Sequence, residues 1–82
     1  MSLKSKIKQL SEDYFDEVLQ IRRHIHANPE LSFQEYETSK FVRKTLESYG
    51  YQGVESIANT GLTVTVKGKN PNKKVIALRA DM

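Results

Sequence analysis

Among the two histidines and ten acidic residues of this chain, five are considered as candidates for catalysis or metal binding: His24, His26, Glu30, Glu35 and Asp81. Histidine and carboxylate side chains are common metal ligands and common general bases in hydrolases. The chain has no cysteine, which excludes disulfides, thiolate metal sites and cysteine nucleophiles. The chemistry open to this sequence is therefore metal binding or acid–base catalysis, if the spacing of these residues permits it.

The two histidines are separated by a single residue on a predicted helix. Positions i and i+2 of a helix point roughly 200° apart, so His24 and His26 cannot bind one metal ion unless the helix breaks between them. A metal role for either residue stays an alternative. The favoured interpretation is that His24 is solvated and that His26 caps carbonyl groups at the C-terminal end of the helix, where a positive charge is favourable.

The carboxylates have different expected roles. Ser32 and Glu35 have the spacing of a capping box, in which each side chain bonds to the backbone N–H of the other residue. Glu30 has no partner that the sequence identifies. Asp81 follows an apolar run, and sites in α/β sheets gather beyond the carboxyl ends of strands. Asp81 is therefore a candidate for a residue near a site, while the chain supplies no predicted catalytic residue and no predicted metal ligand.

The elements that would position these residues follow from hydrophobic spacing. Apolar residues three and four apart predict a helix over about 5–27, which ends at Asn28–Pro29. A second helix is predicted over 33–49, with Gly50 as a left-handed stop. Strands are predicted over 54–57, 62–67 and 74–80.

The expected fold is therefore α/β, with two N-terminal helices followed by three strands. Val75 to Leu78 is apolar without alternation, which is typical of a strand covered on both faces. The two predicted helices must serve the whole sheet, and no later element in these residues is expected to cover its other face. Residues 1–82 are accordingly predicted to be the truncated opening part of an α/β domain.

Composition narrows the function classes. The 82 residues are 38% hydrophobic and 28% charged, with a net charge of +3, which indicates one small globular unit. No apolar run reaches the roughly 18–20 residues of a membrane span, and no secretory signal is evident, so a cytoplasmic protein without a membrane partner is expected. A nucleic-acid partner is not expected, because the lysines around the loop at 68–73 lack interleaved aromatic residues. Those lysines are Lys67, Lys69, Lys73 and Lys74.

Two segments carry a family resemblance. The sequence from Arg22 to Glu35, RRHIHANPELSFQE, resembles the RRxxHxxPELSxxE opening of amidohydrolases of the M20 metallopeptidase family. The NTGL sequence at 59–62 and the IALRADM sequence at 76–82 are similar to the NTG and LRADMDALP segments of the same family. These relatives include N-acyl-amino-acid amidohydrolases, hippurate hydrolases and indole-acetyl-amino-acid hydrolases.

The resemblance implies the mixed-sheet catalytic domain of a hydrolase with two divalent metal ions, Zn²⁺ or Mn²⁺. In such enzymes a bridging water attacks the amide carbonyl of a small N-acyl amino acid, and a glutamate acts as general base. A second, smaller domain usually helps to form a homo-oligomer. The family's metal ligands and base lie beyond the LRADMDALP segment, so this chain is expected to bind no metal and to be inactive alone. Asp81 stands where some M20 relatives have a metal-binding histidine, and the resemblance therefore places it near the site.

A second hypothesis belongs to another class. The chain would then be a standalone small α+β binding module with an acidic partner, which its net charge of +3 permits. The two motifs and the uncovered apolar strand favour the hydrolase interpretation.

Overall fold

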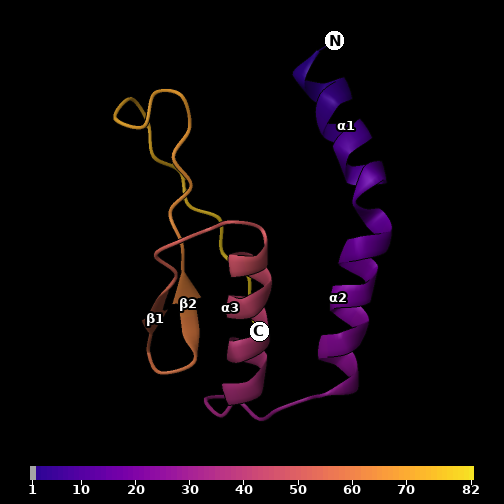
Figure 1. Ribbon diagram of the computed structural model, residues 1–82, viewed down its shortest axis with the longest axis vertical. Coiled ribbons are helices and arrows are strands. Elements are labelled where there is room, and N and C mark those ends of the chain that lie inside the picture. Colours follow the sequence, from indigo (N-terminus) through magenta and orange to yellow (C-terminus); the bar gives the residue numbers. More distant parts are fainter. Residues whose placement is uncertain (1) are drawn as a thin grey trace.

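The computed structural model describes residues 2–82, and this part of the chain forms three helices and a two-stranded antiparallel sheet. The elements are α1 (Leu3–Asp13), α2 (Phe15–Ala27), α3 (Tyr36–Ser48), β1 (Glu55–Ile57) and β2 (Gly61–Thr63). Figure 1 shows α1 and α2 as a long bent rod, with α3 beside α2 and the β1–β2 hairpin on the far side of α3. The predicted combination of N-terminal helices and a following sheet is confirmed in this coarse form.

The single helix predicted over 5–27 is wrong in one respect, because the rod is divided at Tyr14. Tyr14 has φ −96° and ψ 0°, outside the helical region, although its N–H still donates to the carbonyl of Leu10 at 3.0 Å. One turn earlier, the Ser11 hydroxyl donates to the carbonyl of Ile7 at 2.9 Å. A serine that bonds back to a helix carbonyl in this way tends to bend the helix, which accounts for the change of direction.

The start of the second helix is also corrected, from residue 33 to Tyr36. The capping box does not form: Ser32 and Phe33 lie in a turn, and Glu35 precedes the helix without a side-chain capping bond. Phe33 has φ +67°, and the Gln34 N–H donates to the Leu31 carbonyl at 2.9 Å. Residues 33–35, which the capping box would have made the first turn of the helix, therefore lie in or just after this non-helical turn.

The predicted stop at Gly50 is confirmed. Gly50 has φ +91°, its N–H donates to the carbonyl of Glu47, and the Tyr51 N–H donates to the carbonyl of Leu46. These two bonds form a Schellman motif, which requires a residue that tolerates the left-handed conformation.

The predicted strands at 54–57 and 62–67 appear as the shorter β1 and β2, in which Glu55 pairs with Thr63 and Ile57 with Gly61. The third predicted strand, 74–80, is wrong, since these residues have no regular secondary structure. Val75, Ile76 and Leu78 are 89%, 86% and 96% exposed. A strand forms only where a neighbouring strand satisfies its N–H and C=O groups, and within residues 2–82 β1 and β2 pair only with each other.

The buried centre is small and partly polar. Among the described residues, only Val54, Thr38 and Thr60 are less than about a tenth exposed. The molecule measures 42 × 31 × 20 Å and has a Cα radius of gyration of 14.8 Å. A compact chain of this length has a radius of gyration of about 12 Å, so the fold is extended. No helix within residues 2–82 is both long and apolar enough to cross a lipid bilayer.

Candidate functional site

Asp81, the residue that the sequence placed near a site, lies in the irregular C-terminal segment. Its Oδ1 atom is 3.1 Å from an Nη2 atom of Arg79, and the two side chains are 87% and 90% exposed. The pair is formed by residues two apart in an open segment, so it does not require a folded site. The described residues hold no group of three or more His, Cys, Asp or Glu side chains that could bind a metal ion.

The two histidines are not brought together. The His24 ring stacks on the ring of Phe41 in α3, with centroids 3.9 Å apart and an angle of 22° between the planes. His26 is exposed in the last turn of α2. The capping role expected of His26 belongs to Asn28, whose side-chain amide donates to the carbonyl of His24 at 2.8 Å. His24 therefore joins α2 to α3 and is not simply solvated.

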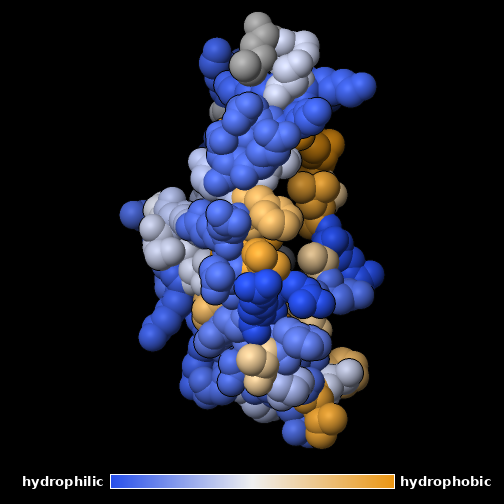
Figure 2. Space-filling model, turned by 90° about the vertical axis from the view of Figure 1, so that its right-hand side faces the viewer, coloured by the Kyte–Doolittle hydropathy of each residue, from blue (hydrophilic) through white to orange (hydrophobic). Residues whose placement is uncertain are grey.

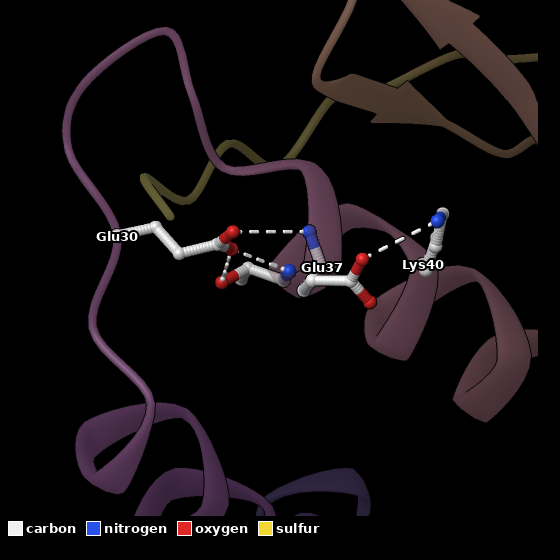
Figure 3. Close-up of polar contacts among 4 residues, drawn as sticks. Glu30, Glu37 and Lys40 are labelled. Carbon is white, nitrogen blue, oxygen red and sulfur yellow. Dashed lines mark hydrogen bonds and ion pairs between the residues drawn. The ribbon is translucent and has the colours of Figure 1, made fainter.

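Glu30 caps α3, a role that the sequence analysis missed. Its carboxylate accepts three hydrogen bonds: from the N–H of Glu37 at 3.1 Å, from the N–H of Thr38 at 2.7 Å and from the Thr38 hydroxyl at 2.6 Å. Figure 3 shows the Glu30 side chain reaching from the loop to the first turn of α3, where an exposed ion pair also joins Glu37 to Lys40. A carboxylate at a helix N-terminus satisfies free N–H groups and interacts favourably with the helix dipole.

These bonds alter the acidity of Glu30. The hydrogen bonds from Thr38, first from its hydroxyl and then from its N–H, lower the pKa of the Glu30 carboxyl below its ordinary value. The signal in the sequence was an acidic residue a few positions before a helix start, but the capping box at Ser32 and Glu35 offered a shorter-range alternative. Glu30 holds the turn against α3 through its ionised form.

Glu35 bonds to the hairpin instead of to Ser32. Its Oε2 atom accepts a hydrogen bond from the hydroxyl of Thr60 at 3.1 Å. Thr60 is 7% exposed and follows two residues with positive φ, Ala58 at +51° and Asn59 at +70°. Left-handed backbone is unfavourable for alanine in particular, so the packing of Thr60 and its bond to Glu35 help to hold this turn.

Arg43 ties the other end of the hairpin to α3. Its guanidinium donates to the Val54 carbonyl at 2.6 Å and to the Ser56 hydroxyl at 2.7 Å. At the far end of α3, the Tyr49 hydroxyl donates to the carboxylate of Glu17 in α2 at 2.8 Å. These contacts position α3 between the rod and the hairpin.

A groove of about 630 Å³ runs between α2 and α3. It is lined by His24 and Ile25 from α2 and by Thr38, Phe41 and Arg43 from α3, among others. The Thr38 hydroxyl is already bonded to Glu30, and the Arg43 guanidinium to Val54 and Ser56. We assign no reaction to the groove.

Several known proteins are similar to this chain along most of its length. It is 42% identical over 79 residues to an N-acyl-L-amino acid amidohydrolase of Geobacillus stearothermophilus, a match that covers 96% of this chain and 21% of that protein. It is 46% identical to thermostable carboxypeptidase 2 of Saccharolobus solfataricus, over all of this chain and 21% of the relative. It is also 46% identical over 70 residues to the hippurate hydrolase of Campylobacter jejuni, a match that covers 85% of this chain and 18% of that protein.

No family model matches the chain, and no solved structure matches it. The chain spans about a fifth of the length of the curated relatives that it matches. These relatives are amidohydrolases and a carboxypeptidase, as the motifs at 22–35, 59–62 and 76–82 predicted. The resemblance to amidohydrolases of the M20 family is therefore confirmed by curated relatives that match most of this chain.

Proposed function

We propose that this chain supplies the opening helices and strands of the catalytic domain of a metal-dependent amidohydrolase. The enzyme would hydrolyse the amide bond of small N-acyl amino acids or related amides, as a cytoplasmic homo-oligomer. The observation that carries the proposal is the similarity to an N-acyl-L-amino acid amidohydrolase along almost the whole chain. The names of the other relatives, a hippurate hydrolase and a carboxypeptidase, point to the same class of bond.

The contacts of the motif residues support this proposal. Glu30 and Glu35 belong to the first motif and Thr60 to the second. Glu30 caps α3, and Glu35 accepts the bond from Thr60 that joins α3 to the hairpin. The motif residues in this chain thus act as structural supports, which fits a segment that positions a catalytic centre built elsewhere.

Two divalent metal ions, Zn²⁺ or Mn²⁺, are part of the proposal for the enzyme. The residues described here do not fit such a centre, because they include no cluster of three or more potential ligands. Asp81, which the motif places nearest to it, pairs with Arg79 in the open segment. The ligands and the general base would therefore come from other residues, and no catalytic step is assigned to this chain.

A chimera tests the proposal. The matched segment of the Geobacillus amidohydrolase is replaced by this chain, and hydrolysis of N-acetyl amino acids and hippurate is measured with Zn²⁺, Mn²⁺ or Co²⁺. The chimera should regain metal-dependent activity that the enzyme lacking this segment does not have, and the 82-residue chain alone should not exceed a metal-only blank. A soluble, folded chimera without activity, or metal-dependent turnover by the chain alone, would contradict the proposal.

A further inference from the structure

We draw no further inference here: the strongest candidate, the exposed apolar face of α1 with Leu3, Ile7, Leu10 and the adjoining Tyr14, belongs to the helical rod that Figure 2 views from the side, and nothing in the structure shows what covers it.

Discussion

The Glu35 carboxylate and the Thr60 hydroxyl, 25 positions apart in the chain, form a hydrogen bond of 3.1 Å. Glu35 precedes α3 and Thr60 precedes β2, so the bond fixes the start of the helix against the hairpin turn. Thr60 is one of the few buried residues among those described, and the turn before it has left-handed backbone at Ala58 and Asn59. The bond thus acts where the backbone is least favourable by itself.

Thr60→Val removes this bond while preserving the shape of the side chain. We expect a loss of about 1 kcal/mol in the free energy of unfolding, the usual net value of one hydrogen bond. Thr65→Val is the matched control, because Thr65 is exposed after β2 and should change stability by less than about 0.5 kcal/mol. Urea unfolding followed by circular dichroism measures both. Equal losses in the two variants would show that the Glu35 contact contributes nothing.

Glu30 should make the stability of α3 depend on acidity. Because its folded pKa is lowered below the ordinary value of 4.5, its contribution is present above that value and is lost as the pH falls through the folded pKa. Glu30→Gln keeps the size but cannot carry the charge that the α3 N–H groups and Thr38 favour. We expect a lower midpoint of urea unfolding at neutral pH and a smaller decrease on acidification than in the parent chain.

Glu12→Gln provides the comparison for Glu30, since Glu12 is exposed on α1, away from the start of α3. Its urea midpoint should follow that of the parent chain at each pH. If Glu30→Gln and the parent chain lost the same stability between neutral and acid pH, the cap would not depend on the ionised carboxylate.

Tyr49 should titrate at unusually high pH. Its hydrogen bond to Glu17, followed by desolvation and the Glu17 charge, raises the pKa of the phenol above 10.0. The contribution of this bond to stability is therefore full below pH 10.0 and is lost as the pH rises through the folded pKa. The difference in phenolate absorbance between the parent chain and Tyr49→Phe isolates this titration. Glu17→Gln should lower the pKa of Tyr49, whereas Asp16→Asn, an equal change of charge on the preceding residue, should lower it less.

Local signals predicted the elements that local interactions stabilise. The helix end at Gly50 needs only the residues around it, and the spacing of apolar residues predicted both the rod and α3. The start of α3 was misplaced because two patterns competed for it. A capping box was available at Ser32 and Glu35, but Glu30 satisfies the helix N–H groups from outside the helix and Glu35 bonds to Thr60.

Features that depend on distant partners were not predictable from the sequence. The apolar run at 75–78 has the composition of a buried strand, but its residues are exposed. A strand also needs a neighbouring strand to pair with, and the composition of the run does not reveal whether one is present. The stacking of His24 on Phe41 likewise depends on how α2 meets α3. The motif that contains Asp81 predicted a position near a site. Within residues 2–82, Asp81 is exposed and forms an ion pair with Arg79.

Arg43→Lys tests the link between α3 and the hairpin. The planar guanidinium reaches both the Val54 carbonyl and the Ser56 hydroxyl, at 2.6 and 2.7 Å, whereas a lysine ammonium is a point donor that cannot span both acceptors. We expect a loss of about 1–2 kcal/mol in the free energy of unfolding. Arg22→Lys, the same exchange at an exposed position of α2, should cost less than about 0.5 kcal/mol. Hydrogen exchange should be faster in β1 and β2 of Arg43→Lys than in those of Arg22→Lys. Unchanged exchange in the hairpin would show that its pairing with α3 does not depend on the forked contact of Arg43.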